Sequence, residues 1–369
     1  MDKLLPEICR IQYGYAFDSA MFSDSEGIPL IRIRDVVRGF SETYTTEACG
    51  AEYIVNDGDI LIGMDGEFNI AHWKGGKAYL NQRVCRLIPS DEVDSLYLYY
   101  FMPKALKAIE DKTPFVTVKH LSAKELNKVI VPMPLLDEQR RIASSLQKVD
   151  ELIALRKEQL AKLDRLVKSR FVEFFESCEL SDETTIEAIT EQVKVGFVGT
   201  CEKYYTDKSG VPMLRTGNIT EKGIDLKDLK YVTREFHEKN KKSQIHAGDL
   251  LIARHGSNGQ ANVYSGPEAQ CLNAVVIVPN QSIASSIFLA GLINSPMVKE
   301  QIERTLVGST QRVVNTKSIA SLKVNVPNIA VQRQYEEFVK QTDKSKLAIQ
   351  QSLDKLEILK KSIMQEYFG

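Results

Sequence analysis

Two groups of polar side chains fall in expected loop segments, and their types suit contact with double-stranded DNA. Arg, Asn, Gln, Ser and Thr can hydrogen-bond base edges in the major groove, whereas Lys and Arg suit phosphates. The first half of the chain offers Arg32, Asn69, His72, Lys74, Thr117 and Lys119. The second half offers Arg215, Asn218, Arg254, His255, Ser257, Asn258, Gln260, Ser309, Thr310, Gln311 and Arg312. Any one of these alone is better explained as a solvated loop residue, so the prediction rests on their clustering.

Motifs for catalysis are missing from the sequence. It has no Gly-x-x-x-x-Gly-Lys-Ser/Thr loop for a nucleoside triphosphate and no Gly-x-Ser-x-Gly elbow. Segment 294–297 faintly resembles the Asn-Pro-Pro-aromatic tetrapeptide of amino-methyltransferases, but a turn at a helix start explains it better. Asp59 and Asp249 occupy matching positions in the two halves, and turn capping explains them. We therefore predict no catalytic residues and no enzyme.

Composition places the chain among ordinary globular proteins of two or three domains, with 369 residues, 43% hydrophobic and 26% charged. The six cysteines and five histidines are scattered without metal-ligand spacing, so we predict no metal site and reduced cysteines that act as small apolar residues. The net charge of −1 neither proves nor excludes DNA binding. No signal peptide or membrane span is indicated, which predicts a cytoplasmic protein.

The elements that would position the polar loops are dominated by one long helix. From Asp137 to about Glu176 the chain has no proline or glycine, and its apolar residues recur at steps of three and four. Position 139 plus 193 is position 332, and at that offset a second helix repeats the first from Val331 to Phe368. The predicted seam residues are Ile142, Leu146, Val149, Ile153, Leu160, Leu163 and Val167, and Val339, Ile349, Leu353, Leu356 and Ile363.

The two segments outside the helices repeat each other in weaker form. Segments 27–32 and 210–215 match, as do 57–62 and 247–252, and each Gly-Asp step predicts a tight turn before a buried strand. Each Val-x-Val-Pro segment predicts a strand that proline ends. The pattern predicts four domains: mixed α/β globules over 1–136 and 178–330, each followed by a long helix over 137–177 and 331–369.

A helix of about 38 residues spans roughly 57 Å, more than one globule needs for packing. Arg156 interrupts the first seam and Lys346 the second, and each is expected to face an apolar stretch in the other helix, as in intrachain antiparallel pairing. The alternative is two separate helices, each lying on its own globule. Off the seam, a further set of apolar residues marks a partner interface or a surface that the globules cover: Leu152, Leu155, Leu166, Ile358 and Leu359.

With this layout in view, the sequence resembles the specificity subunits of type I restriction–modification systems along essentially its whole length. The most specific segments are Tyr13–Phe17, Gly27–Arg32, Gly58–Ile62 and Pro134–Ile142. The second copy departs at the last of these, because segment 329–334 lacks the Glu-Gln pair.

The resemblance implies two target-recognition domains, separated by two long helices that form an antiparallel coiled coil with pseudo-twofold symmetry. Each domain would read one half of an asymmetric bipartite DNA target. The helices would set the spacing between half-sites and dock two methyltransferase subunits, and restriction and translocase subunits would join through the complex. S-adenosylmethionine, ATP and magnesium would belong to those partners, with no cofactor in this chain.

A reading of a different class is a coiled-coil protein–protein adaptor with two α/β binding heads and no role in DNA binding. An enzyme with a novel site is the weakest reading, because no chemical constellation recurs in both halves.

Overall fold

The protein is described by a computed structural model that covers residues 2–113, 119–220, 223–254, 259–306 and 313–369. It divides into two compact units. Unit 1 is Met1–Arg156 with Ser352–Gly369, and unit 2 is Lys157–Gln351. Both long helices, α5 (Leu136–Glu176) and α10 (Ile329–Phe368), pass through both units, so each unit holds one globule and part of each helix.

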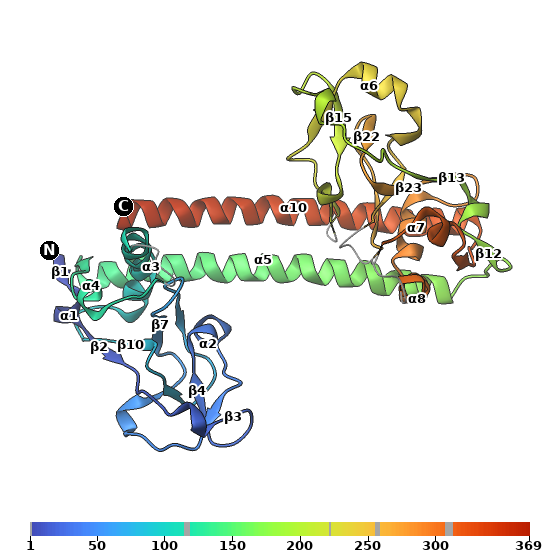
Figure 1. The fold of residues 1–369 in the computed structure, drawn as a ribbon. Coiled ribbons are helices and arrows are strands. Elements are labelled where there is room, and N and C mark those ends of the chain that lie inside the picture. Colours follow the sequence, from blue (N-terminus) through green and yellow to red (C-terminus); the bar gives the residue numbers. More distant parts are fainter. Residues whose placement is uncertain (1, 114–118, 221–222, 255–258, 307–312) are drawn as a thin grey trace. The chain divides into compact units, whose positions relative to one another are not determined.

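Unit 1 contains a four-stranded sheet of order β2-β10-β7-β8, a five-stranded sheet of order β3-β5-β4-β9-β6 and the pair β1-β11. Figure 1 shows α3 and the four-stranded sheet beside the start of α5. The strands are β1 (Asp2–Leu4), β2 (Cys9–Tyr13), β3 (Phe22–Ser23), β4 (Ile28–Ile31), β5 (Tyr44–Thr45), β6 (Ile54–Val55), β7 (Ile60–Gly63), β8 (Ile70–His72), β9 (Ala78–Leu80), β10 (Val84–Pro89) and β11 (Ile130–Pro132). The helices are α1 (Leu5–Ile8), η1 (Ser19–Met21), α2 (Ile33–Arg38), η2 (Ala51–Tyr53), α3 (Ser95–Lys112) and α4 (Ala123–Leu126).

Unit 2 repeats this topology, with sheets β13-β23-β20-β21 and β14-β18-β15-β22-β19 and the pairs β12-β24 and β16-β17. The strands are β12 (Thr184–Thr185), β13 (Thr190–Val195), β14 (Tyr205–Thr206), β15 (Val211–Leu214), β16 (Ile219–Thr220), β17 (Gly223–Ile224), β18 (Lys230–Val232), β19 (Gln244–Ile245), β20 (Leu250–Ala253), β21 (Ala261–Val263), β22 (Ala269–Cys271), β23 (Ala274–Pro279) and β24 (Lys323–Val324). The helices are η3 (Glu187–Ile189), η4 (Glu202–Tyr204), η5 (Thr216–Asn218), α6 (Arg234–Lys239), η6 (Lys241–Ser243), α7 (Ser286–Ile293), α8 (Pro296–Leu306) and α9 (Thr316–Ala320).

The predicted turn before each central strand is confirmed. Gly58 and Gly248 have φ of +90° and +99°, in the left-handed region that glycine enters without a Cβ clash. The next residue closes the turn, since Asp59 Oδ2 accepts from the Asn56 amide and Asp249 Oδ2 accepts from the His246 amide, both at 2.9 Å. Strands β7 and β20 follow, with every residue buried.

The two Val-x-Val-Pro segments end differently. In unit 1, strand β11 runs into Pro132 as predicted, because its edge pairs with β1. In unit 2, β24 ends at Val324, and Pro327 makes only an isolated bridge to Leu180. Proline has no amide hydrogen and tolerates either position at a strand end.

The core of unit 1 packs the four-stranded sheet and α3 against one end of each long helix. Ile142 and Leu146 of α5 and Phe368 of α10 are buried in one hydrophobic cluster. The ring centroid of Phe368 lies 5.3 Å from that of Tyr97 and 5.8 Å from that of Phe101, both on α3. The last residues of the chain are therefore structural parts of unit 1.

The core of unit 2 uses aromatic side chains at the corresponding place. Phe171 of α5 lies 5.3 Å from Tyr335 of α10 and 5.5 Å from Phe288 of α7, measured between ring centroids. A Cβ on Gly291 would come within 2.8 Å of the Phe171 ring, so glycine at this position of α7 permits the close approach.

Two buried glutamines, Gln139 and Gln332, tie each globule to its helix, and we call them the glutamine joints. They are 1% and 0% exposed. The Gln139 side chain accepts from the Asp94 amide at 2.9 Å and donates to the Pro134 carbonyl at 3.0 Å. Gln332 repeats this geometry with the Ser285 amide at 2.9 Å and the Pro327 carbonyl at 2.8 Å. Because Asp94 and Ser285 are the N-caps of α3 and α7, each joint fixes a globule helix to the start of a long helix.

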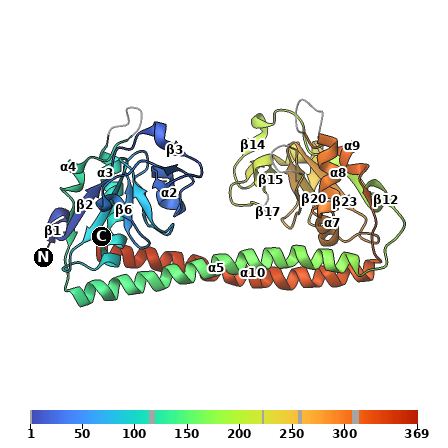
Figure 2. The same ribbon diagram turned by 90° about the horizontal axis from the view of Figure 1, so that it is seen from below.

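The long helices run antiparallel within each unit. In unit 1, Arg141 Nη2 lies 3.3 Å from the Tyr367 hydroxyl and Lys360 Nζ lies 2.7 Å from Asp150 Oδ1, so higher numbers on one helix face lower numbers on the other. In unit 2, Lys346 Nζ lies 2.8 Å from Asp164 Oδ1. Figure 2 shows α5 and α10 side by side in each unit. The predicted fold class, mixed α/β globules with two packed long helices, is confirmed.

Every predicted seam residue lies on a buried or half-buried face of its helix. The two seam interruptions differ from the prediction in their partners. Arg156 Nε donates to Ser352 Oγ at 3.3 Å, and Lys346 pairs with Asp164. Each long cationic side chain thus reaches a polar group on the facing helix instead of an apolar stretch, because its stem can pack while its head turns towards water.

All six cysteines are free, and four of them are buried. Burial raises the pKa of the Cys9, Cys85 and Cys271 thiols to about 12, so they behave as small apolar residues. Within the described ranges, no helix is both long and apolar enough to cross a membrane. The described residues also contain no group of three His, Cys, Asp or Glu side chains placed to hold a metal ion.

Candidate nucleic-acid interface

In unit 1, three loop segments meet at the end of the four-stranded sheet. The Leu121 amide donates to the Met64 carbonyl at 2.7 Å, and the Gly66 amide donates to the Lys119 carbonyl at 2.9 Å. These bonds join the turn after β7 to the segment that precedes α4. The backbone therefore holds side chains from distant parts of the sequence at one edge of the sheet.

The side chains brought together there are Asp65, Arg83 and His120, which we call the unit 1 loop cluster. His120 Nδ1 lies 2.6 Å from Asp65 Oδ1, and Arg83 Nε lies 3.7 Å from Asp65 Oδ2. The Arg83 and His120 side chains are 53% and 47% exposed, and that of Asp65 is 24% exposed. A carboxylate accepts from cytosine N4, and arginine donates to guanine O6 and N7, so these groups can hydrogen-bond base edges.

The matching edge of unit 2 carries Arg254 and Asn273, which we call the unit 2 loop cluster. The Val314 amide donates to the Arg254 carbonyl at 3.0 Å, and the Arg254 guanidinium donates to Asn273 Oδ1 at 2.9 Å. Asn273 has φ of +53°, a left-handed conformation that asparagine tolerates better than most residues. The arginine is half-buried and held in place.

Strand register shows that the two loop clusters lie at the same edge of matching sheets, with Arg83 and Asn273 at equivalent positions. Val84 pairs with Gly63 in unit 1, and Ala274 pairs with Ala253 in unit 2. Arg83 directly precedes Val84, and Asn273 directly precedes Ala274. Met64 directly follows Gly63, and Arg254 directly follows Ala253. The same scaffold thus presents an aspartate paired with an arginine and a histidine in unit 1, and a fixed arginine–asparagine pair in unit 2.

The candidates in unit 1 lie in different environments. Lys119 is half-buried and donates to the Glu110 carbonyl at 2.8 Å. His72 Nδ1 lies 3.0 Å from the Gly58 carbonyl oxygen, and the His72 ring centroid lies 4.4 Å from that of Tyr99. Asn69 is half-buried, whereas Lys74 is exposed. The geometry leaves Lys74 the most accessible of these four side chains, whereas His72 packs against the fold.

Arg32 and Arg215 lie at the same point of the two folds, each as the N-cap of the element that follows a sheet strand. Arg32 is exposed. The Arg215 guanidinium donates to the Asp228 carbonyl at 3.3 Å. Asn218 is 5% exposed, accepts from the Arg215 amide at 2.9 Å and donates to the Asp225 carbonyl at 3.1 Å, so its amide holds the turn together.

Gln260 is half-buried at the start of β21. The remaining candidates lie outside the described residues: Thr117, His255, Ser257, Asn258, Ser309, Thr310, Gln311 and Arg312.

The structure adds Arg83, His120 and Asn273 to the site, and sequence reasoning missed all three. The signal available was the turn before β10 and β23, which holds a polar residue at 83 and at 273 in equivalent places. Trp73 lies between the candidates His72 and Lys74, but it is 1% exposed and donates from Nε1 to the Gly76 carbonyl at 2.6 Å, so it is a core residue.

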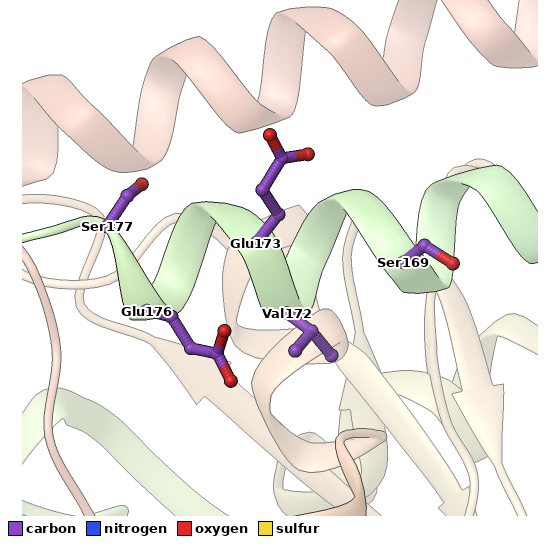
Figure 3. Close-up of a pocket in the computed structure, with 5 residues that line it drawn as sticks. All are labelled: Ser169, Val172, Glu173, Glu176 and Ser177. Atoms are coloured by element: carbon purple, nitrogen blue, oxygen red, sulfur yellow. The ribbon is translucent and has the colours of Figure 1, made fainter.

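A shallow depression of about 580 Å³ lies along α5 in unit 2, lined by Ser169, Val172, Glu173, Glu176 and Ser177. Figure 3 shows Glu173 and Val172 leaving the helix in opposite directions. Glu173 pairs with Arg170 at 2.8 Å. Two glutamates would repel phosphates, so this depression does not belong to a nucleic-acid interface.

Comparison with known protein families decides the class of this chain. The family model described as "Type I restriction modification DNA specificity domain" matches residues 2–165 and 184–358. The chain belongs to this family of type I specificity subunits. Among curated relatives, the EcoBI specificity subunit of Escherichia coli is 27% identical over 99% of this chain and 84% of that protein. The MjaVIII specificity subunit of Methanocaldococcus jannaschii is 24% identical over 85% of this chain and 79% of that protein.

Two solved structures share the fold of this specificity subunit. The S subunit of a type I restriction–modification system from M. genitalium has a TM-score of 0.64 at 14% identity, covering 100% of this chain and 96% of that one. A chain from a structure of the type I R-M system, described for its complex assembly and conformational transition, has a TM-score of 0.58 at 16% identity, covering 100% and 97%.

Membership confirms the family that the sequence indicated. Specificity subunits are non-catalytic, and catalysis lies in other subunits of the system, which confirms the prediction that this chain is not an enzyme.

Proposed function

We propose that this specificity subunit reads an asymmetric, bipartite DNA target, with unit 1 recognising one half-site and unit 2 the other. The observation that carries the proposal is the pair of loop clusters. Asp65 with Arg83 and His120, and Arg254 with Asn273, lie at the same edge of matching sheets and differ in charge and hydrogen-bonding groups. Two domains of the same fold that present different side chains suit a target whose two halves differ in sequence.

The long helices would set the distance between half-sites. The 41 residues of α5 span about 60 Å at 1.5 Å per residue. Duplex DNA repeats every 34 to 36 Å, so a rod of this length suits half-sites about one turn apart or somewhat more.

The same helices would dock methyltransferase subunits, two in the proposed assembly. In unit 1, Leu152 and Leu155 of α5 are 43% and 54% exposed, and Ile358 and Leu359 of α10 are 69% and 46% exposed. We call these four residues the helix leucine patch. The exposure of these four side chains supports a partner interface over a surface that the globule of unit 1 covers. The contact of Asp150 with Lys360 places Leu152 level with Ile358 along the helix pair.

Introducing negative charge into this patch tests the docking. Leu152→Glu with Leu155→Glu should leave the isolated subunit folded, because both side chains are exposed, and should abolish co-purification with the methyltransferase. Met297→Glu is the matched control, since Met297 is 43% exposed on α8 and lies off the long helices. Equal retention of the methyltransferase by both variants would argue against this docking surface.

The test of the whole function is reconstitution with the neighbouring methyltransferase, followed by single-molecule mapping of methylated sites. We expect methylation only at a two-part target. Arg83→Ala should relax specificity in one half-site, and Arg254→Ala should relax it in the other, by about 1–3 kcal/mol for each lost base contact. Methylation irrespective of DNA sequence would contradict the proposal.

A coiled-coil adaptor without a DNA role is the other candidate, because the helix leucine patch would serve it equally well. A gel shift with the assembled complex separates the two functions, since the adaptor gives no sequence-dependent shift. In the proposed assembly, S-adenosylmethionine, ATP and magnesium are bound by partner subunits, restriction and translocase subunits join through the complex, and the protein works in the cytoplasm.

A further inference from the structure

At one equivalent point of the fold, the two units carry different segments between neighbouring strands, which we call the excursions. In unit 1, residues 32–43 form α2 between β4 and β5. In unit 2, η5 and the β16–β17 pair lie between β15 and β18. Both excursions start at an arginine N-cap, Arg32 or Arg215, whose amide donates at 2.9 Å to a buried side chain, Asp35 or Asn218. The excursions therefore start in the same way in both units, whereas the secondary structure that follows differs.

The excursion of unit 1 is anchored firmly. Asp35 is 1% exposed, and its Oδ2 also accepts from the Ser41 hydroxyl at 3.2 Å. The Val36 side chain is fully buried in the cluster that contains Trp73. Buried anchors of this kind fix the direction of the outer side chains before any partner binds.

Two apolar side chains, Val37 on α2 and Phe40 just after its C-cap Gly39, are left largely exposed. Val37 is 64% exposed and Phe40 is 50% exposed. A partner that covers both side chains would remove their apolar surface from water and so gain binding free energy.

Cationic side chains surround this apolar pair. Arg34 and Arg38 are 51% and 48% exposed on the same short helix. Arg34 Nε lies 3.7 Å from Asp35 Oδ1, and Arg38 Nη1 lies 3.5 Å from Oε2 of the exposed Glu42, a pair that a phosphate would displace. The segment of Lys74 lies against the end of the helix, because a Cβ on Gly39 would meet Lys74 Cβ at 3.6 Å. Lys74 itself is exposed.

This combination fits duplex DNA better than a protein partner. A stable protein interface buries a larger area than these two side chains provide, and lysine is depleted there, whereas arginine and phenylalanine are common in both kinds of interface. The major groove is about 12 Å wide and admits a helix, phosphates line its rim, and the thymine C5-methyl group is its main apolar feature. Arginine and lysine at the rim with apolar residues between them match that arrangement.

We propose that Val37 and Phe40 contact thymine C5-methyl groups in the major groove of the half-site read by unit 1, with Arg38 and Lys74 on the flanking phosphates. This inference rests on the proposed function. It assigns α2 as a base-reading element of unit 1 and predicts at least one thymine in that half-site.

The test uses the complex with its methyltransferase and the target found by methylation mapping. Each thymine of the unit 1 half-site is replaced in turn by dU, which removes only the methyl group, and affinity is measured by competition. The wild-type complex should lose about fourfold at one or two positions, the value for one exposed methyl group. The Val37→Ala/Phe40→Ala variant should bind the thymine and dU duplexes equally.

Ile130→Ala is the matched control, since Ile130 is 58% exposed on β11 of the same unit, and it should keep the wild-type response to dU. Unchanged Trp73 fluorescence would show that the double variant folds normally. A wild-type complex that ignores dU at every thymine, a half-site without thymine, or a double variant that keeps the wild-type dU loss would overturn the inference. A wild-type complex with no sequence preference at all would overturn the proposed function instead.

Discussion

Replacing Gln139 with alanine should destabilise unit 1 by about 3 kcal/mol. The side chain is 1% exposed and satisfies the Asp94 amide at 2.9 Å and the Pro134 carbonyl at 3.0 Å. Its removal leaves both backbone groups without this partner in a buried place, at about 1–3 kcal/mol each when no water replaces it. The N-terminus of α3 would lose its attachment to α5.

The assay is urea unfolding followed by tryptophan fluorescence. Trp73 is the only tryptophan of the chain, and it is 1% exposed in a core cluster of unit 1, so its emission reports that unit. A loss of about 3 kcal/mol should lower the urea midpoint by about 1–2 M. Gln147→Ala is the matched control, because Gln147 is an exposed glutamine on the same helix whose amide donates to Glu151 at 3.0 Å. It should cost under about 0.5 kcal/mol.

Two further variants separate hydrogen bonding from packing. Gln139→Met keeps the volume and should still lose about 2 kcal/mol. Gln139→Glu keeps the acceptor for Asp94 but turns an oxygen towards the Pro134 carbonyl, which favours the protonated acid and raises its pKa in the folded state. Its stability relative to wild type should therefore be highest in acid and fall as pH rises through the folded pKa. Equal midpoints for Gln139→Ala and Gln147→Ala would refute the role of the joint.

Three other predictions concern spacing, thiols and a buried carboxylate. Inserting one heptad into both α5 and α10 should lengthen the target spacer by about 10 Å, or roughly three base pairs, without changing either half-site; methylation mapping would show an altered half-site if the rod model is wrong. A thiol reagent at pH 8, with labelling read by mass spectrometry, should modify the partly exposed Cys178 before the buried Cys85, whose pKa is raised to about 12; early labelling of Cys85 would contradict its burial. Burial raises the pKa of Asp249, so ionising this carboxyl lowers stability as pH rises through the folded pKa. Asp249→Asn keeps an acceptor for the His246 amide, and its stability relative to wild type should increase in thermal melts as pH rises from below the ordinary aspartate pKa through the raised folded pKa of Asp249; a constant difference would contradict the raised pKa.

Sequence patterns predicted the long helices and the tight turns correctly, because both depend on interactions between residues close in sequence. The apolar steps of three and four fixed both long helices to within two residues of α5 and α10. The Gly-Asp turns before β7 and β20 could be inferred because a left-handed glycine and an aspartate that caps its own turn need no distant partner.

The site was predicted only in outline. Lys74 and Arg32 are exposed, as contact with DNA requires, whereas the Asn218 side chain is buried and holds a turn together. Residue type alone does not separate an amide that faces DNA from one that bonds nearby carbonyls. His120 could not be found, because its closeness to Asp65 depends on a backbone contact across 55 positions.

The sequence alone determined the internal repeat, two mixed α/β units and two long helices, because periodicity and turn chemistry act within a few residues. Only the tertiary structure decided what the residues of those repeats do in the fold. Gln139 and Gln332 were visible as matching letters, but only packing makes them buried joints, since their partners lie 45 and 47 positions away. The two loop clusters were likewise decided by sheet register, which brings distant polar side chains to one edge and gives each unit its own chemistry.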